Sequence, residues 1–317
     1  MNAKDTMFDK NRYGKILVPV LTPFGDDQEL DLEKLTSLID YLIENNKADT
    51  LILSGTTGEF HTQTFDERVA VFEAGVEAAA GRLPVVAGIG CTSTKETIAL
   101  GRKAVDLGIE TLMVVSPYYT KPSQTELLAH YEAVAGELGN ANIMLYNIPI
   151  FTGVNLSPEI VGQLAQIENV VAIKDEAELN PKQITQYLNV TPEDFILYNG
   201  DDTMILETYA QAGERVGGVV SGASHLLGDF IRTMIETFQA GDVVEAGRMQ
   251  AKLYPVLKIM GQGGRTNPAP LWKDAMRIAG VDAGSPRLPL TSASPEEREN
   301  IRRELERFGA LELAAAK

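Results

Sequence analysis

A short apolar run, often rich in β-branched residues, recurs along this chain and limits the folds that it can adopt. Eight such runs lie within about 220 residues of the 317-residue chain, spaced about 20 to 35 residues apart. Runs of this length and composition are typical of strands buried on both faces of a parallel sheet. The predicted strands are 16–20, 51–53, 85–87, 111–115, 143–146, 170–174, 195–198 and 216–220.

The segments between these runs carry apolar residues at helical spacing, as in 32–42 and 94–107. Asp31 and Thr94 are expected to cap the N-termini of these two helices. Eight alternating strands and helices predict an α/β fold, a closed (β/α)8 TIM barrel, with a doubly wound sheet as the competing layout. No glycine-rich dinucleotide loop follows an early strand, which counts against the doubly wound sheet.

The pattern becomes entirely helical from about residue 226. Four further helices are predicted, at 230–239, 243–260, 270–279 and 295–308. We therefore expect a barrel catalytic domain at 1–225 and a C-terminal helical domain at 226–317.

Composition excludes several classes of partner. The formal net charge of −16 argues against binding to nucleic acid or to an anionic membrane. No run approaches the ~20 apolar residues of a membrane span, and no hydrophobic signal core follows the first residues. The single cysteine, Cys91, cannot form an internal disulfide, which fits a reducing compartment. We expect a cytoplasmic protein. Three histidines without zinc-type spacing indicate no metal site.

Two polar residues end neighbouring apolar runs. Lys174 ends the run 170–174, and Tyr146 ends the run 143–146, 28 residues earlier. That spacing is typical of one strand–helix–strand unit, so both side chains should lie at the same end of neighbouring parallel strands. In a parallel barrel this end carries the chemistry. A lysine in dry surroundings can lose its proton and attack a ketone, forming a Schiff base.

Each of these residues also has a purely structural interpretation. Lys174 could form an ion pair inside the barrel mouth, with Glu176 or Asp201 as its partner. Tyr146 could be either a general acid/base or a core tyrosine with one bonded hydroxyl. Buried lysines are rare, which favours a functional role for Lys174.

Three loops at the same predicted end carry further candidates. The segment 54–59, SGTTGE, offers the hydroxyls of Thr56 and Thr57 and the flexible backbone of Gly55, which suit a small carboxylate or form a plain turn. The segment 116–122 contains Tyr119, which could relay a proton or pack at a subunit interface. Asp201 and Asp202 favour a structural turn or helix cap over a metal site.

Taken together, these segments resemble the dihydrodipicolinate synthase / N-acetylneuraminate lyase family of pyruvate-dependent class I aldolases. The resemblance covers about residues 13–290 and rests on GTTGE, SPYY with KPSQ, YN-P, IK and NGDD in this order. It implies a (β/α)8 barrel with a C-terminal helical domain and a homotetramer built as a dimer of dimers. It also implies no metal and no organic cofactor.

The resemblance assigns roles to the matching positions. Lys174 matches the Schiff-base lysine, and Tyr146 matches the tyrosine that moves protons to and from bound pyruvate. Thr56 matches the threonine of the proton relay, and Thr57 the one that holds the pyruvate carboxylate. Tyr119 matches the relay tyrosine offered across a dimer interface.

Gly200 and Val220 match positions that line the pyruvate end of the pocket.

One position departs from the family pattern. Synthases of the family that act on aspartate semialdehyde carry an arginine two residues after the proline of YN-P, where this chain has Phe151. A phenyl ring cannot make the bidentate contact that a guanidinium makes with a second carboxylate. The sequence Lys174-Asp175 also resembles the IKD form of sugar-acid lyases.

We therefore expect a Schiff-base lyase that makes or breaks a carbon–carbon bond between a 2-oxo acid and an aldehyde. The first expectation is a 2-keto-3-deoxy-sugar-acid type aldolase. The alternatives are a 4-hydroxy-tetrahydrodipicolinate synthase that condenses pyruvate with aspartate semialdehyde, a 2-oxo acid dehydratase, and a non-catalytic sensor that retains the pocket.

Overall fold

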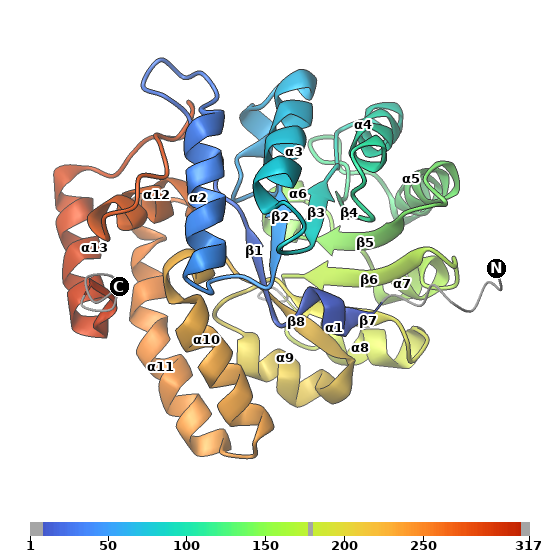
Figure 1. Ribbon diagram of the computed structural model, residues 1–317. Helices are drawn as coiled ribbons and strands as arrows, with labels where there is room; N and C mark the ends of the chain where they lie inside the picture. The colour runs from blue at the N-terminus through green and yellow to red at the C-terminus, as the bar shows by residue number, and fades with distance from the viewer. Residues whose placement is uncertain (1–8, 177–179, 312–317) are drawn as a thin grey trace. The chain divides into compact units, whose positions relative to one another are not determined.

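The computed structural model describes residues 9–176 and 180–311. Its eight strands hydrogen-bond in sequence order and close into a barrel (Figure 1), so the predicted (β/α)8 class and all eight strands are confirmed. The strands are β1 Ile16–Pro19, β2 Thr50–Leu53, β3 Val85–Gly88, β4 Thr111–Val115, β5 Asn142–Asn147, β6 Val170–Asp175, β7 Ile196–Asn199 and β8 Val216–Val220.

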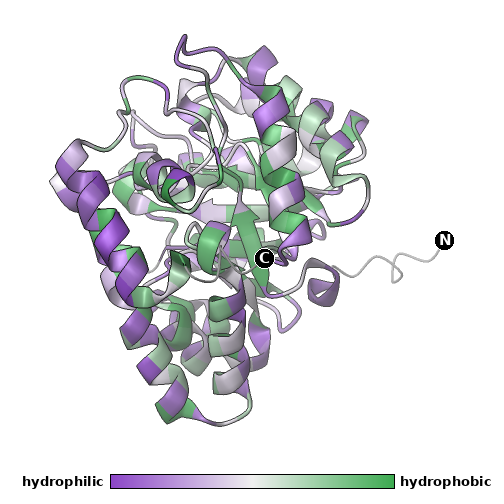
Figure 2. Ribbon diagram, turned by 60° about the vertical axis from the view of Figure 1, so that its left-hand side comes forward, coloured by the Kyte–Doolittle hydropathy of each residue, from purple (hydrophilic) through white to green (hydrophobic). Residues whose placement is uncertain are grey.

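Nearly every strand residue is buried, on both faces of the sheet, which explains why the strands read as continuous apolar runs. Figure 2 shows strands in the hydrophobic colour beside helices of alternating colour. The pairing of β5 with β6 is parallel, and Tyr146 lies opposite Lys174. The expected placement of these two residues at the same end of adjacent strands is therefore confirmed.

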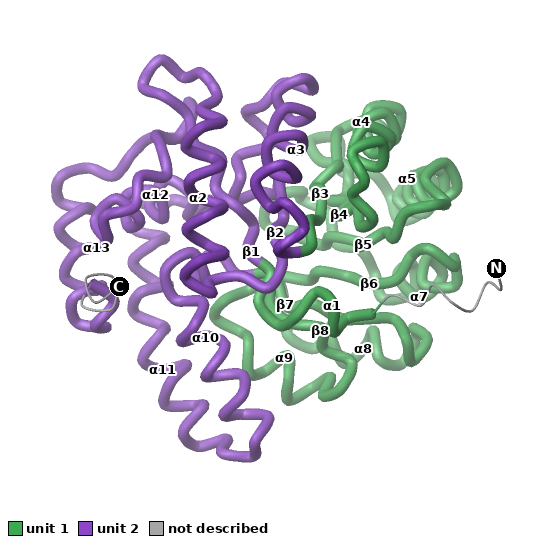
Figure 3. Tube along the Cα trace, in the orientation of Figure 1, with its two compact units in different colours: residues 1–17, 84–220 green, residues 18–83, 221–317 purple. Residues whose placement is uncertain are grey.

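The chain divides into two compact units (Figure 3). The first contains residues 1–17 and 84–220, and the second contains 18–83 and 221–317. The helices of the first unit are α1 Lys10–Tyr13, α4 Thr94–Asp106, α5 Gln124–Glu137, α6 Pro149–Thr152, α7 Pro158–Leu164, α8 Gln183–Val190, α9 Ile205–Ala212 and the 3₁₀ turn η3 Gly213–Arg215. Those of the second are α2 Leu32–Glu44, η1 Phe60–Thr62, α3 Phe65–Ala79, α10 Ser224–Gln239, α11 Val243–Ile259, η4 Gln262–Gly264, α12 Ala269–Ile278 and α13 Pro295–Phe308.

The helix caps follow the sequence with one correction. The Asp31 carboxylate accepts the N–H of Lys34 at 2.9 Å and caps α2, as expected. The cap of α4 is Ser93, not Thr94. Ser93 has the extended backbone that a cap requires, and its hydroxyl accepts the N–H of Glu96 at 3.2 Å. Thr94 is the first helical residue, and its hydroxyl bonds to His130.

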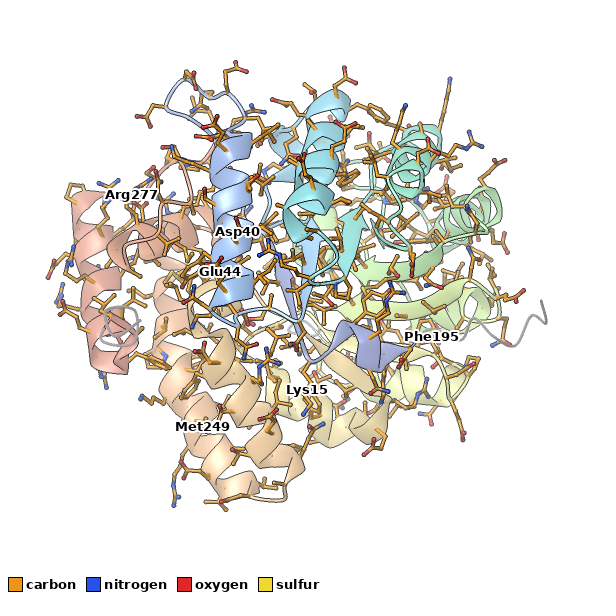
Figure 4. The ribbon with its side chains drawn as sticks, in the orientation of Figure 1. Lys15, Asp40, Glu44, Phe195, Met249 and Arg277 are labelled. Atoms are coloured by element: carbon orange, nitrogen blue, oxygen red, sulfur yellow. The ribbon has the colours of Figure 1, made fainter. Side chains whose placement is uncertain are left out.

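All four predicted C-terminal helices are present in the second unit. Figure 4 labels Met249 on α11 and Arg277 on α12, and it labels Asp40 and Glu44 on α2. The division into domains at 1–225 and 226–317 stays a prediction. The outer ends of these domains, residues 1 and 317, lie outside the described residues. Within 9–176 and 180–311, no helix combines the length and the apolar character that crossing a membrane requires.

Candidate active site

Lys174 lies near the carboxyl end of β6, between Tyr146 of β5 and Tyr198 of β7, and only 4% of its surface is exposed. Successive residues of a strand point to opposite faces of the sheet. The next residue, Asp175, contacts α8 through Gln183 and Tyr187. Lys174 therefore lies on the face of β6 that turns away from α8.

The side chains of Tyr146 and Glu176 meet at the lysine amine. Lys174 Nζ lies 3.9 Å from the centroid of the Tyr146 ring and 3.5 Å from Glu176 Oε1. The Tyr146 hydroxyl donates a hydrogen bond of 3.3 Å to the same Glu176 oxygen. The ion pair that the structural interpretation allowed is therefore present with Glu176, and it lies beside the predicted acid/base tyrosine.

Burial controls the protonation of this cluster. It lowers the pKa of Lys174, while the charge and the hydrogen bond of Glu176 oppose that change. It also raises the pKa of Glu176 to about 7; Lys174 opposes this increase, and Asp201 and Asp202 add to it. Both changes favour the neutral amine and the neutral acid. A neutral amine is the form that attacks a carbonyl carbon.

Gly200 supplies the space that Lys174 occupies. A Cβ placed on Gly200 would lie 2.7 Å from Lys174 Cε and 2.8 Å from Glu176 Cγ. Its N–H donates to the carbonyl of Asp175 at 2.9 Å, which fixes the backbone at this close approach. Gly200 therefore lies beside the lysine, and its expected role in lining the pyruvate end of the pocket stays a prediction.

A buried polar network holds β5 and β6 behind the site. The Asp175 carboxylate accepts hydrogen bonds from Asn147 Nδ2 at 2.7 Å and from the Tyr187 hydroxyl at 2.9 Å. Burial raises the pKa of Asp175. This network was not predicted from the sequence. Two features of the sequence could have indicated the network. Asp175 directly follows Lys174 and so points to the opposite face of the strand, and Gln183 and Tyr187 are four residues apart on one face of the next helix.

Three further predicted residues belong to the first unit. Val220 ends β8, is buried, and pairs with Leu17 of β1. Phe151 lies on α6, directly after β5, and 38% of its surface is exposed. Tyr119 has a positive φ of 76° and is 90% exposed, so this chain alone does not bury it.

The remaining candidates, Gly55, Thr56 and Thr57, lie in the second unit, in the loop after β2. The loop folds tightly, since the carbonyl of Thr56 accepts the N–H of Glu59 at 3.0 Å. Glu59 is buried, and its carboxylate lies 2.5 Å from Lys273 Nζ. This ion pair anchors the end of the loop to α12.

Thr57 and Trp272 both lie near Gly222, which no sequence pattern predicted. A Cβ placed on Gly222 would lie 3.9 Å from Thr57 Oγ1 and 3.7 Å from the indole nitrogen of Trp272. The signal available in the sequence was that Trp272 is the single tryptophan of the chain. Thr56 and Thr57 are both half-buried, so part of each side chain remains accessible to solvent.

The paired aspartates form a turn. Asp201 Oδ1 accepts hydrogen bonds from both the N–H and the hydroxyl of Thr203, each at 2.8 Å. No group of three histidine, cysteine, aspartate or glutamate residues suited to a metal ion is found in the described part of the chain. The geometry of Asp201 agrees with the structural interpretation of this segment.

Known proteins resemble this chain over nearly its whole length. The sequence model of the Dihydrodipicolinate synthetase family matches residues 12–308. A protein of Bacillus velezensis named 4-hydroxy-tetrahydrodipicolinate synthase is 41% identical over 285 residues, covering 90% of this chain and 96% of that protein.

Solved structures show the same fold. Dihydrodipicolinate synthase from Cyanidioschyzon merolae with lysine bound is 35% identical, with a TM-score of 0.88, covering 94% of this chain and 99% of that one. The prophage protein YagE from E. coli K12, described as belonging to the dihydrodipicolinic acid synthase family and solved in complex with pyruvate, is 26% identical, with a TM-score of 0.86 and the same coverage. This chain therefore belongs to the dihydrodipicolinate synthetase family, as its motifs predicted, and is a pyruvate-dependent lyase of the Schiff-base class.

Proposed function

We propose that this chain condenses pyruvate with aspartate semialdehyde, as a 4-hydroxy-tetrahydrodipicolinate synthase, through a Schiff base on Lys174. The observation that carries the Schiff-base step is the buried Lys174 amine, in register with Tyr146 and with a pKa that burial lowers. The second substrate is proposed from the name of the relative that is 41% identical.

The reaction follows from the chemistry of the amine. Neutral Lys174 attacks the ketone carbon of pyruvate, water leaves, and a protonated imine remains. The imine accepts the electron pair released when the methyl carbon loses a proton, and the resulting enamine attacks the aldehyde carbon. We assign the proton transfers to Tyr146, assisted by Thr56 and Tyr119. We assign binding of the pyruvate carboxylate to Thr57 and to the backbone N–H groups beside Gly55.

A specific observation favours a second candidate. Phe151 stands where the semialdehyde-using synthases have an arginine, and its partly exposed ring provides no charge for a second carboxylate. This feature fits the 2-keto-3-deoxy-sugar-acid aldolase that the sequence analysis placed first, whereas the relatives favour the synthase. The dehydratase alternative uses the same imine. The enzyme class of the family excludes a non-catalytic sensor.

The two candidates are separated by assaying both reactions on one preparation. We expect consumption of pyruvate with aspartate semialdehyde, and little pyruvate release from 2-keto-3-deoxygluconate in a coupled NADH assay. Phe151→Arg should raise kcat/KM for the semialdehyde at least about tenfold, since one charged contact contributes about 1.5–3 kcal/mol. Phe151→Leu is the matched control and should not raise it. Pyruvate release from the sugar acid without any reaction of the semialdehyde would reverse the assignment.

We also infer a homotetramer, a dimer of dimers in which Tyr119 of one subunit reaches the site of another. Its 90% exposure supports this inference, because a large aromatic side chain on a strained backbone is expected to be covered by a partner. Light scattering should give about four times the 34.4 kDa chain mass. A monomer that is fully active would contradict the inference.

A further inference from the structure

Glu176 contacts both reactive groups of the first unit. Its Oε1 lies 3.5 Å from Lys174 Nζ and accepts the Tyr146 hydroxyl at 3.3 Å. A carboxylate with a purely structural role would need to contact only the lysine. A single carboxyl oxygen shared by the nucleophile and the acid/base tyrosine is instead placed to exchange protons with each of them.

The charged surroundings of Glu176 are defined by three elements. Lys174 approaches from β6, Tyr146 from β5, and Asp201 and Asp202 from the loop after β7. A Cβ placed on Gly200 would lie 2.8 Å from Glu176 Cγ, so the space between Gly200 and Glu176 is too small for a side chain at position 200. A quarter of the Glu176 side chain remains exposed, which provides a route by which protons exchange with solvent.

We propose that Glu176 is a catalytic residue that takes the proton Lys174 must lose and returns it to the hydroxide that leaves during Schiff-base formation. This inference rests on the proposed function, in which Lys174 Nζ is the reacting atom.

The proposed steps balance in atoms and charge. Glu176 carboxylate accepts a proton from Lys174 ammonium, which leaves a neutral amine and a neutral acid. The amine forms a bond to the ketone carbon, the carbonyl π pair moves to oxygen, and a proton passes from nitrogen to that oxygen. The carbinolamine nitrogen then expels hydroxide, which takes the proton from Glu176 and departs as water. The products are a protonated imine and, beside it, the Glu176 carboxylate as its counter-ion.

The electrostatics agree with this cycle. Burial raises the pKa of Glu176 to about 7 and lowers that of Lys174, so the preference of the proton for the amine over the carboxylate is reduced. A group that both accepts and returns a proton works best when its pKa lies near the working pH.

Replacement of Glu176 distinguishes proton transfer from simple charge stabilisation, because the two roles predict opposite effects. The Glu176 charge raises the pKa of Lys174, so its removal makes more neutral amine available at pH 7. If charge were its only role, Glu176→Gln would form the imine faster. If Glu176 carries the proton, the same variant forms it more slowly.

The experiment measures the rate of imine formation with pyruvate in single turnovers from pH 5.5 to 9, trapped with borohydride. We expect Glu176→Gln to be slowed about 10²-fold at pH 7 and to lose the change in rate with pH that is centred near 7. Glu176→Asp, which retains an acid, should recover part of the rate. Glu168→Gln, an exposed carboxyl just before β6, is the matched control and should behave like the wild type.

An unchanged or faster rate in Glu176→Gln, with the pH profile intact, would overturn the role of Glu176. A wild-type protein that forms no pyruvate adduct would instead refute the proposed function. Thermal unfolding of each variant shows whether a slow rate reflects loss of the fold.

Discussion

At the scale of single residues, the space around Lys174 is the most exacting feature of the site. Gly200→Ala would place a methyl group 2.7 Å from Lys174 Cε and 2.8 Å from Glu176 Cγ, closer than such atoms pack. Because both side chains are confined, we expect the amine to be displaced and imine formation with pyruvate to fall at least tenfold. The unfolding free energy should fall by about 1–3 kcal/mol.

Gly136→Ala is the matched control for this substitution. Gly136 lies in α5, and a Cβ there would meet nothing within 4 Å. Alanine favours a helix over glycine by about 0.5–1 kcal/mol, so this variant should be slightly more stable and fully active. Equal activity of the two variants would contradict the crowding account.

Some residue-scale features were predictable and others were not. The meeting of Lys174 and Tyr146 follows from strand spacing, because residues at equivalent positions of parallel strands are neighbours. The Tyr146–Glu176 hydrogen bond depends on side-chain directions beyond the end of a strand, which no periodicity specifies. The position of Thr57 near Gly222 joins residues more than 160 apart in sequence, and a local pattern cannot reveal it.

At the scale of elements, the packing of α10 depends on one glycine. A Cβ on Gly228 would overlap the backbone carbonyl of Lys47, just before β2, and backbone cannot move aside as a flexible side chain can. Lys47 is itself buried and paired with Asp229 of the same helix. Gly228→Ala should therefore destabilise the protein by about 1–3 kcal/mol in urea unfolding.

Gly247→Ala in the neighbouring helix α11 is the matched control, and we expect it to change stability in the opposite direction. Nothing lies within 4 Å of a Cβ at Gly247, so alanine should stabilise the protein by about 0.5–1 kcal/mol. If both glycines responded alike, helix propensity rather than close packing would explain the effect at Gly228.

The elements themselves were largely predictable from sequence, because apolar runs and helical spacing report burial directly. Their boundaries were less so. The predicted helix 230–239 begins six residues earlier, at Ser224, and contains a non-helical residue at Leu227. The first turn there is stabilised by a Ser221 hydroxyl and by the bond between His225 and Gly222, which are contacts of the folded state.

At the scale of the whole molecule, stability should depend on pH through a buried histidine. His225 Nδ1 donates to the carbonyl of Gly222 at 2.9 Å, and Nε2 accepts the N–H of Leu21 at 3.2 Å, so the ring is neutral. Burial lowers its pKa to about 4. The unfolded chain takes up a proton near pH 6.5 and the folded chain does not, so stability is complete above pH 6.5 and is lost as pH falls toward 4.

The size of this effect follows from the two pKa values. At pH 5 the loss attributable to His225 is roughly 2 kcal/mol relative to pH 8. His225→Gln should lose this difference, with its value at pH 8 giving the packing cost alone. Urea unfolding at the two pH values makes the comparison. An equally steep pH dependence in the variant would show that other groups cause it.

The class of the whole molecule was predictable because eight strand-and-helix repeats leave few alternatives to a closed barrel. The second substrate was not. The single change at Phe151 led the sequence analysis to a sugar-acid aldolase, whereas similarity along the whole chain favours the synthase. A single residue can change which substrate a pocket favours without changing the fold of the protein.

The proposed function requires that Lys174 form a Schiff base with pyruvate. Reduction with borohydride in the presence of pyruvate, followed by peptide mass mapping, detects this bond. We predict one reduced pyruvate attached to the peptide that contains Lys174, and no adduct in Lys174→Met. An adduct on a different lysine, or none in the wild-type protein, would contradict the claim.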